Sequence, residues 1–367
     1  MNIYYIANIR MPTEKAHGYQ IAKMCEAFAY NRCDVSLIVP MRRNNIKEDI
    51  PNYYGVRNNF FVHHIPTFDA LTFFGGSRLG FHAQAVSFLL TLRKIAIPRD
   101  AVIITRNPEI AWWYGRTGRR VFYDAHNFPT RGRRLLKWFL GNVSGIIANS
   151  NGTAEAFRKL EFANILVAPN AVDLSEFDNA IPADRKKSGL PTGRIVMYVG
   201  HLYSWKGIDI VVEAARRFKN SNTTFVFIGG TDSDLDAYKD KTKDLGNVLF
   251  LGRRPHIEIP YLMKSADVLL LPNVAISDES KFYTSPIKMF EYMASGVPIV
   301  ASNLPSIREI LDDANSILVR AGDSIELTKG IEQAFSTGKF LAKKALSDVR
   351  RYTWSVRAEK VQVFLEK

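Results

Sequence analysis

A loop that leads into a helix, followed directly by an apolar strand, is the segment best suited to hold a phosphorylated ligand. It covers residues 285–300, SPIKMFEYMASGVPIV. Ser285 and Pro286 suit the N-cap and the first position of a helix, and Gly296 suits its end. The unpaired amide hydrogens and the positive dipole end of such a helix start attract an anion. Glu291, about a turn and a half further along, could accept hydroxyl groups of the same molecule, and a nucleotide has both features.

Two earlier segments have the composition of loops that follow buried strands. Residues 198–207, YVGHLYSWKG, combine a strand end, a loop and a helix start, and residues 169–173 read PNAVD. Together with residues 285–300, these motifs resemble those of the retaining glycosyltransferases of family 4. The resemblance covers nearly the whole chain in the expected order. It implies the GT-B fold, in which two Rossmann-like domains face a central cleft.

Strand and helix patterns alternate along the chain, which is typical of α/β proteins with doubly wound, mostly parallel sheets. The expected strands are Asn2–Ile9, Asp34–Val39, Phe60–Ile65, Ala101–Thr105, Arg120–Ala125, Gly145–Ala148, Asn164–Ala168, Arg194–Gly200, Thr223–Ile228, Asn247–Leu251, Asp267–Leu271, Pro298–Val300 and Ser316–Val319. We expect an N-terminal Rossmann-like acceptor domain over residues 1–171 and a C-terminal Rossmann-like donor domain over residues 172–351. The resemblance implies that a helix of residues 352–367 packs back on the first domain.

Lys206 follows an expected strand and is expected to open a helix. A cation there could meet the departing diphosphate of a nucleotide sugar and stabilise the charge that grows as the glycosidic bond breaks. A solvated lysine is the alternative, although the helix dipole disfavours a cation at a helix start. Gly200 and His201 precede it in the same donor-binding motif. The family commonly has arginine in place of His201, so full cationic help at neutral pH does not carry over from that position.

Glu291 matches the second glutamate of the family's pattern, which the resemblance assigns to the ribose hydroxyls. The first glutamate, eight positions earlier, is replaced by Tyr283, so sugar selection by a carboxylate at that position does not carry over. Lys288 is either a second phosphate contact or a solvent-facing residue. Arg253 falls where the family's loop flanks the nucleobase, and a surface arginine is the alternative. The backbone expected to cradle phosphate is that of Thr284, Ser285, Pro286 and Ile287.

His126 stands just beyond the expected strand 120–125, at the edge of the sheet where ligands gather. The resemblance implies that it lies near the reacting sugar, helps to hold the donor and stabilises the transition state. A structural hydrogen bond is the alternative for a lone histidine. Asp124 is expected to point the other way along the strand and to be structural. The resemblance thus implies catalytic roles for His126, Lys206 and Glu291.

The loop of residues 11–18 corresponds in position to the family's glycine-containing first loop, which the resemblance implies lies against the donor phosphate and the acceptor. Gly18, at an expected helix start, could let the backbone approach a ligand closely. Lys15 and His17 are candidate acceptor contacts in the same loop.

Asp232-Ser233-Asp234 has the Asp-X-Asp pattern that binds metal and nucleotide in the other major glycosyltransferase fold. It follows a strand end and begins a helix, so helix capping explains its acidic side chains without a metal ion. It also lacks the glycine and the terminal glutamate of a calcium loop. We therefore expect no metal and no cofactor beyond a nucleotide-sugar co-substrate.

The bulk properties are those of a globular protein with room for two domains. The chain has 367 residues, of which 47% are hydrophobic and 23% are charged,. No apolar run reaches the roughly 18 residues that a membrane span needs, and residues 1–9 lack the basic leader of a signal peptide. Cys25 and Cys33 have no metal-site spacing, so we expect a reducing, cytoplasmic environment.

The net charge of +13 is concentrated in the first half of the chain, where residues 1–171 hold 22 Lys and Arg against 11 Asp and Glu. This asymmetry indicates an anionic partner, either a nucleic acid or an acidic membrane surface. Nucleic-acid binding is disfavoured, because no recognised reader motif and no aromatic-rich basic strand face occurs.

Residues 131–140, RGRRLLKWFL, predict a basic amphipathic helix. The expected apolar side is formed by Leu135, Leu136, Phe139 and Leu140, and the expected acceptor or membrane contacts are Arg133, Arg134, Lys137 and Trp138. Such a helix either lies on an anionic bilayer or packs its apolar side on the sheet, and the sequence leaves both open. Phe73 and Phe74, near Arg78, also look exposed.

The sequence therefore predicts a cytoplasmic, metal-independent, retaining hexosyltransferase, peripheral on the inner face of the cell membrane. It would move a hexose from a UDP- or GDP-sugar to a glycan or lipid-linked acceptor. The alternatives are a non-hydrolysing nucleotide-sugar epimerase of the same fold, and a non-catalytic relative that binds a nucleotide sugar or a lipid. The departures at His201 and Tyr283 keep the second alternative open.

Overall fold

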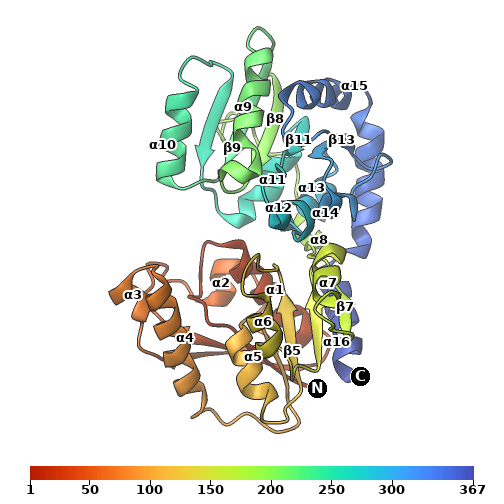
Figure 1. The fold of residues 1–367 in the computed structure, drawn as a ribbon. Helices are drawn as coiled ribbons and strands as arrows, with labels where there is room; N and C mark the ends of the chain where they lie inside the picture. The colour runs from red at the N-terminus through yellow and green to blue at the C-terminus, as the bar shows by residue number, and fades with distance from the viewer. The chain divides into compact units, whose positions relative to one another are not determined.

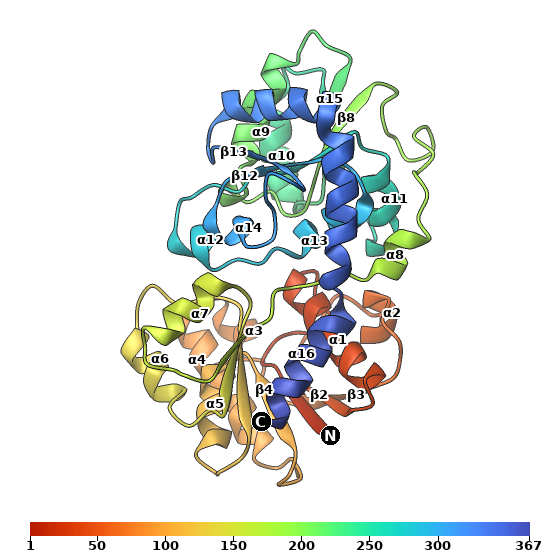
Figure 2. The same cartoon turned by 90° about the vertical axis from the view of Figure 1, so that its right-hand side faces the viewer.

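The computed structural model describes all 367 residues, which form two compact units (Figures 1 and 2). The first unit contains Met1–Asn149, Thr153–Pro169 and Trp354–Lys367. The second contains Ser150–Gly152 and Asn170–Thr353. Each unit has its own sheet and its own helices, so each is described separately.

The first unit is built on a seven-stranded, all-parallel sheet with strand order β3-β2-β1-β4-β5-β6-β7. Its strands are β1 (Asn2–Ile6), β2 (Asp34–Met41), β3 (Phe61–Pro66), β4 (Val102–Thr105), β5 (Val121–Ala125), β6 (Gly145–Ala148) and β7 (Ile165–Val167). The order reverses at β1, from which the chain first extends to β2 and β3 and then returns to β4. Every strand expected in this half is present, with β1 three residues shorter than its apolar run.

Helices cover this sheet: α1 (Ala16–Tyr30), α2 (Ile50–Tyr54), α3 (Ala70–Phe74), α4 (Arg78–Leu92), α5 (Pro108–Gly115), α6 (Arg133–Phe139), α7 (Asn151–Arg158) and α16 (Trp354–Glu366). The last helix, α16, belongs to the first unit although it ends the chain, and it packs on α1. Arg357 of α16 is buried and donates hydrogen bonds to the carbonyl oxygens of Ala168 and Pro169.

The second unit has a six-stranded parallel sheet with strand order β10-β9-β8-β11-β12-β13. Its strands are β8 (Arg194–Val199), β9 (Thr223–Ile228), β10 (Val248–Gly252), β11 (Val268–Leu271), β12 (Ile299–Ser302) and β13 (Ile317–Val319). Its helices are α8 (Leu174–Asp178), α9 (Ile208–Arg217), α10 (Asp232–Lys241), α11 (Ile259–Lys264), α12 (Asp278–Phe282), α13 (Ile287–Ser295), α14 (Pro305–Arg308) and α15 (Ser324–Asp348). The doubly wound α/β architecture predicted for both halves is confirmed.

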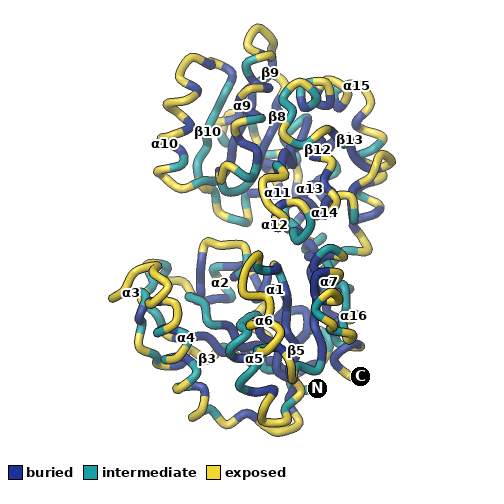
Figure 3. The backbone as a smooth tube through the Cα atoms, viewed as in Figure 1, coloured by how far each residue is buried: buried dark blue, intermediate teal, exposed yellow.

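Strand β8 shows why both faces of the second sheet are covered. Its alternate residues Ile195, Met197 and Val199 join one hydrophobic cluster, while Val196 and Tyr198 join another on the opposite face. Side chains of a strand alternate between faces, so a strand that is apolar at every position needs cover on both sides. The central strands are accordingly the buried interior of each unit, whereas the edge strand β3 is largely exposed (Figure 3).

The helix expected at Ser285 begins later than predicted. Pro286 is the N-cap of α13, with ψ 127°, and the first helical residue is Ile287. Ser285 does not cap the helix, because its hydroxyl accepts a hydrogen bond from the backbone N–H of Asn170 at 2.9 Å. Gly296 ends the helix in the left-handed conformation, as predicted,.

The acidic side chains of the Asp-X-Asp segment are explained by helix capping, as predicted. Thr231 is the N-cap of α10, and its hydroxyl and the side chain of Asp234 form a reciprocal capping box,.

The predicted apolar side of the helix over residues 131–140 is wrong in part. Leu136 and Leu140 are buried and Phe139 is half-buried, but Leu135 is 57% exposed. Trp138, expected as a membrane contact, is 54% exposed. Leu135 and Leu136 are successive residues, so their side chains leave the helix about 100° apart, whereas Leu135 and Trp138 are three apart and share the outer side. No helix of the chain is long and apolar enough to cross a membrane.

Candidate active site

Two lysines of the second unit form the centre of the candidate donor site. Lys206 ends a short 3-10 turn, Ser204–Lys206, and precedes α9 rather than opening it as expected. Its Nζ lies 3.7 Å from the centre of the Trp205 ring. Burial lowers the pKa of Lys206 from its usual value to about 8, against the smaller opposing effect of Glu279. Lys206 is half-buried, and a bound anion would favour its charged form.

Lys288 lies in the first turn of α13, and its surroundings bear on one of the two interpretations of this residue. Its Nζ is buried, has no hydrogen-bond partner and lies 3.9 Å from the centre of the Tyr198 ring. The solvent-facing alternative is therefore wrong. Burial and then the nearby charge of Lys206 hold the pKa of Lys288 well below its usual value, although Glu291 opposes this. An ammonium group buried without a partner is costly, and a bound anion would remove that cost.

Gly200 keeps the space beside this amine open. A Cβ atom at Gly200 would lie 2.5 Å from Nζ of Lys288, and the residue has a φ of 138°, which side chains with a Cβ rarely adopt,. The predicted importance of Gly200 therefore has a steric basis.

Glu291 lies further along α13 and is buried except for 9% of its surface. Its Oε1 lies 3.3 Å from Nε2 of His256, and Nδ1 of His256 lies 3.7 Å from Oε2 of Glu176. The imidazole thus bridges two carboxylates. Sequence reasoning missed His256 and Glu176. His256 follows the loop already assigned to the nucleobase, but its contact with Glu291 joins residues 35 apart in the chain.

The segment before α13 is held by Asn170, which sequence reasoning did not single out although it lies in the PNAVD motif. The side-chain amide of Asn170 donates to the carbonyl oxygen of Ser285 at 2.6 Å. Thr284 Oγ1 lies 3.2 Å from Ser306 Oγ. Pro286 has no N–H and cannot donate to a phosphate, so only the amides of Thr284, Ser285 and Ile287 could do so. The prediction that the backbone of Pro286 helps to bind phosphate is therefore wrong.

The remaining donor-site candidates lie near the ends of other elements. Tyr283 is half-buried at the end of α12, and Arg253 is exposed after β10. His201 is half-buried, and its ring stacks on Tyr203 with centroids 5.0 Å apart and an interplanar angle of 6°. Burial lowers the pKa of His201, and the nearby charge of Lys288 lowers it further to a smaller extent. The imidazole is therefore neutral at pH 7, in line with the doubt about its cationic role.

In the first unit, Asp124 is the centre of a buried polar cluster. Its Oδ2 accepts a hydrogen bond from Tyr5 Oη at 2.6 Å and from Arg106 Nε at 3.0 Å, and its Oδ1 accepts one from Arg357 Nη2 at 3.3 Å. Burial opposes ionisation, but His126, Arg106 and Arg357 together hold the pKa of Asp124 well below its usual range. The carboxylate is charged and fully engaged.

His126 belongs to the same cluster, so the expectation that Asp124 points away from it is wrong. Its Nε2 lies 3.1 Å from Asp124 Oδ2 and 2.7 Å from Arg106 Nη2. Residues two apart in a strand share a face, which the sequence interpretation overlooked. Burial and then the charge of Arg106 lower the pKa of His126 to about 4. A neutral imidazole that accepts from Arg106 at Nε2 carries its proton on Nδ1.

Arg106 was missed, although it directly follows β4 and so satisfied the same strand-end criterion that selected His126. Besides Asp124 and His126, its guanidinium contacts the side-chain oxygen of Gln20.

The loop before α1 contains the other candidates of the first unit. Lys15 is exposed at the N-cap of α1, and His17 is half-buried. Burial, and to a smaller extent the charge of Arg106, lowers the pKa of His17 to about 4. Gly18 has a packing reason to be glycine, because a Cβ there would lie 2.0 Å from the hydroxyl of Tyr54. That hydroxyl bonds to both the N–H and the carbonyl oxygen of Thr13.

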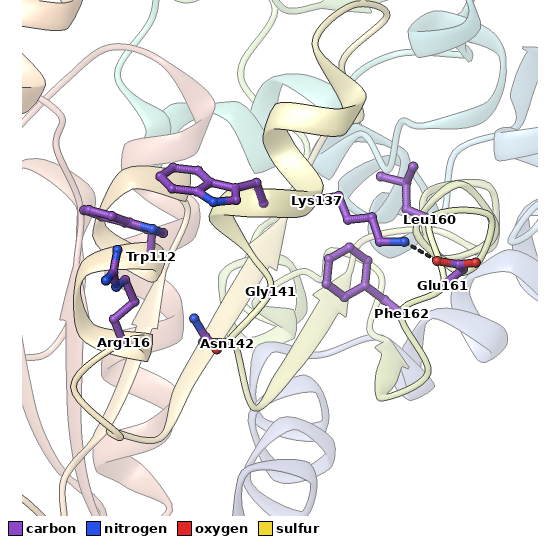
Figure 4. A pocket seen from close by; sticks show the side chains of 9 residues that line it. Trp112, Arg116, Lys137, Gly141, Asn142, Leu160, Glu161 and Phe162 are labelled. Atoms are coloured by element: carbon purple, nitrogen blue, oxygen red, sulfur yellow. Dashed lines mark hydrogen bonds and ion pairs between the residues drawn. The ribbon is translucent and has the colours of Figure 1, made fainter.

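The basic residues of α6 are partly engaged within the protein. Lys137 forms an ion pair with Glu161, and the guanidinium carbon of Arg133 lies 5.3 Å from the centre of the Phe128 ring. Arg134 is exposed. Lys137 and Trp138 line a wide hollow of about 570 Å³ (Figure 4). Its other lining residues are Trp112, Arg116, Gly141, Asn142, Leu160, Glu161 and Phe162.

Two family models match the chain. Residues 18–176 match the model described as Glycosyltransferase Family 4, and residues 193–337 match the model described as Glycosyl transferases group 1. Together with the two parallel sheets, these matches identify the chain as a glycosyltransferase of the GT-B type. It belongs to glycosyltransferase family 4.

Solved structures share this fold over the whole chain. Sucrose-phosphate synthase from Thermosynechococcus elongatus matches with a TM-score of 0.79 at 18% identity, covering 100% of both chains. HepE from Anabaena, solved in complex with UDP and glucose, matches with a TM-score of 0.75 at 18% identity, covering 100% of this chain and 99% of HepE. At such identities the likeness shows the fold alone.

Curated relatives are more similar over shorter stretches. The 2-deoxystreptamine glucosyltransferase of Streptomyces kanamyceticus is 27% identical over 211 residues, which are 54% of this chain and 52% of that protein. The phosphatidyl-myo-inositol mannosyltransferase of Mycolicibacterium smegmatis is 30% identical over 199 residues, 51% of this chain and 48% of that protein. The chain thus spans about half the length of the curated relatives it matches.

Proposed function

We propose that this chain transfers a hexose from a nucleotide sugar to a glycan or lipid-linked acceptor, with retention of the anomeric configuration and without a metal ion. The observation that carries the proposal is the buried, unpartnered amine of Lys288 close to Lys206. The diphosphate of a nucleotide sugar would give both amines an anionic partner and would favour their charged forms.

The two lysines would take the part that a divalent cation has in other phosphate sites. Their positive charge would stabilise the diphosphate as it leaves, because charge on its oxygens grows when the glycosidic bond breaks. The amides of Ser285 and Ile287 at the start of α13 would add hydrogen-bond donors for the same group.

Glu291 would accept hydrogen bonds from the ribose hydroxyls. Its contact with His256 fixes the position of one carboxylate oxygen and leaves the other for the ligand,. A uridine nucleotide is the donor we favour, because HepE, which shares the fold, has been solved with UDP-glucose.

The first unit would hold the acceptor and contribute His126. Neutral at pH 7, this imidazole would donate its Nδ1 proton to an oxygen of the reacting sugar, while Arg106 donates to Nε2 and fixes the ring. Asp124 does not act as a nucleophile in this account, because both its oxygens already accept hydrogen bonds from buried donors.

We infer a front-face transfer from these roles. The bond between the anomeric carbon and the diphosphate oxygen breaks, the acceptor oxygen bonds to the same face of that carbon, and the acceptor's proton passes to the leaving diphosphate. The basic first half of the chain favours an acidic acceptor, such as a lipid-linked glycan at the inner membrane face,.

The test is a thermal-shift series with UDP, GDP, ADP and their hexose conjugates, repeated on Glu291→Ala. Binding to the folded state raises the midpoint by mass action. We expect one base to give a shift that the variant largely loses. The absence of a shift with every nucleotide would overturn the proposal.

A second incubation separates transfer from epimerisation. With the donor that binds and no acceptor, a transferase leaves the sugar configuration unchanged, whereas an epimerase alters it. We expect the hexose of the recovered donor to be unaltered by NMR, and an inverted carbon would assign the site to an epimerase.

A further inference from the structure

Helix α4 is apolar on its outer side as well as on its buried side. It buries Gly80, Gln84, Phe88 and Leu92, which recur every four residues. Leu79, Val86 and Leu90 lie on the opposite side, seven and four residues apart, and each is more than half exposed,. Arg78 and His82 are the exposed polar residues of this helix. The exposed apolar side chains beside them are of the kind that protein or lipid normally covers.

The preceding segment extends this surface. Phe73 of α3 is 71% exposed, and Phe68 stacks on it with ring centroids 5.0 Å apart. Helices α3 and α4 pack closely, because a Cβ at Gly80 would lie 2.6 Å from the carbonyl oxygen of Gly75. Figures 1 and 3 show the two helices together, largely exposed.

We call this surface the apolar face. Its residues are between 47% and 71% exposed, and they are Phe68, Phe73, Phe74, Leu79, Phe81, Val86 and Leu90. Single exposed apolar side chains are ordinary, but a group of this size on two adjacent helices marks an interaction surface.

Cations outnumber carboxylates along the segment that carries the apolar face, which Asp69 and Asp100 flank. Residues 70–99 contain Arg78, Arg93, Lys94 and Arg99 and no Asp or Glu. The nearest preceding carboxylate, Asp69, is paired with Arg42, whose Nε lies 3.0 Å from its Oδ1. Aromatic and aliphatic side chains bordered by unopposed cations are complementary to a bilayer with anionic headgroups.

We propose that the apolar face docks on an anionic lipid bilayer. The phenylalanine and leucine side chains enter the boundary between headgroups and acyl chains, and Arg78 and Lys94 contact the headgroup phosphates. This inference goes beyond the proposed transfer reaction and does not depend on it. It also differs from the expectation for α6, where Arg133 and Lys137 already contact Phe128 and Glu161.

The test is flotation of the full chain with vesicles of phosphatidylcholine containing phosphatidylglycerol, and with phosphatidylcholine alone. The test variant is Phe73→Ser/Leu79→Ser/Leu90→Ser, whose side chains are all exposed. The matched control is Phe340→Ser, because Phe340 is 78% exposed on α15 of the second unit. Circular dichroism confirms that the variants fold.

We expect the wild-type chain and the control to float with anionic vesicles, and the triple variant to lose at least about ten-fold in binding. Arg78→Glu and Lys94→Glu should each weaken binding by roughly five-fold or more at low salt. Failure of the wild-type chain to float, or equal binding by the triple variant, would overturn the proposal. A dimer in light scattering that the triple variant abolishes would assign the face to a second copy instead.

Discussion

Lys288 illustrates, at the scale of a single residue, how a binding site can be built at the expense of stability. Its amine has no hydrogen-bond partner in the folded chain, and its pKa is held well below the usual value mainly by burial. A group placed in this way gains a hydrogen-bond partner only when an anion arrives, so function and stability should conflict at this position.

Replacement of Lys288 by methionine should therefore stabilise the free protein. The variant keeps the length of the side chain and removes the unsatisfied ammonium group, which is worth about 1–3 kcal/mol in the free energy of unfolding. Thermal and denaturant unfolding without ligand measure this change. Lys339→Met, at an exposed position of α15, is the control and should change little. A lower midpoint for Lys288→Met than for wild type would contradict the account.

His126 allows a prediction about pH. Its pKa is lowered from 6.5 to about 4, so the unfolded chain binds more protons than the folded chain between these pH values,. The contribution of His126 to the free energy of unfolding is therefore fully present above about pH 6.5 and is lost as the pH falls toward 4. NMR titration of the imidazole C–H signals, assigned with His126→Gln, should show a neutral ring down to about pH 5. A midpoint near 6.5 would show that the buried cluster around Asp124 is wrongly described.

The candidate site was predictable where function depends on local pattern. Lys206, Gly200 and Glu291 stand out by their place in short motifs after strands. His256 does not, because its role comes from contacts with carboxylates far along the chain. Asp124 could have been assigned correctly from the two-residue period of a strand alone.

At the scale of elements, helix α16 buries one charged side chain, Arg357, among its apolar ones. Arg357 is 5% exposed and connects the helix to Asp124 of β5 and to the carbonyl oxygens that follow β7. Replacement of Arg357 by alanine leaves Asp124 with one fewer cation and should cost about 3–5 kcal/mol in the free energy of unfolding.

The matched control for α16 is Lys360→Ala, at an exposed position on the same helix. Calorimetry of both variants should show a large fall in the melting temperature only for Arg357→Ala. Equal melting temperatures would mean that α16 is held by its apolar residues alone.

The start of α13 shows why element ends were harder to predict than elements. Strands such as β9 and β6 coincide with the predicted ranges, because a run of apolar, largely β-branched or aromatic residues between polar turns has few alternative uses. Ser285 is of a residue type that often caps a helix, but its hydroxyl accepts a hydrogen bond from the backbone N–H of Asn170. A capping rule that considers only neighbouring residues cannot detect a partner 115 residues away in the chain.

At the scale of the whole molecule, the unequal distribution of charge and the apolar face occur in the same half of the chain. The surplus of 11 positive charges lies within residues 1–171, and residues 70–99 add no carboxylate to it. Composition could indicate an anionic partner, but only the fold separates the exposed side of α4 from its buried side. The sequence had indicated Phe73 and Phe74 near Arg78 as exposed, but its patterns favoured residues 131–140 and did not identify the outer side of α4.

The measurement that tests the central claim most directly is calorimetric titration of UDP-glucose into the wild-type chain, Lys288→Met and Lys339→Met. The claim is that Lys206 and Lys288 hold the diphosphate of a nucleotide sugar. We expect wild type and Lys339→Met to bind with similar dissociation constants, and Lys288→Met to bind at least about ten-fold more weakly while being more stable, since a charge-assisted contact is lost. Equal affinity of Lys288→Met and wild type for UDP-glucose would contradict the claim.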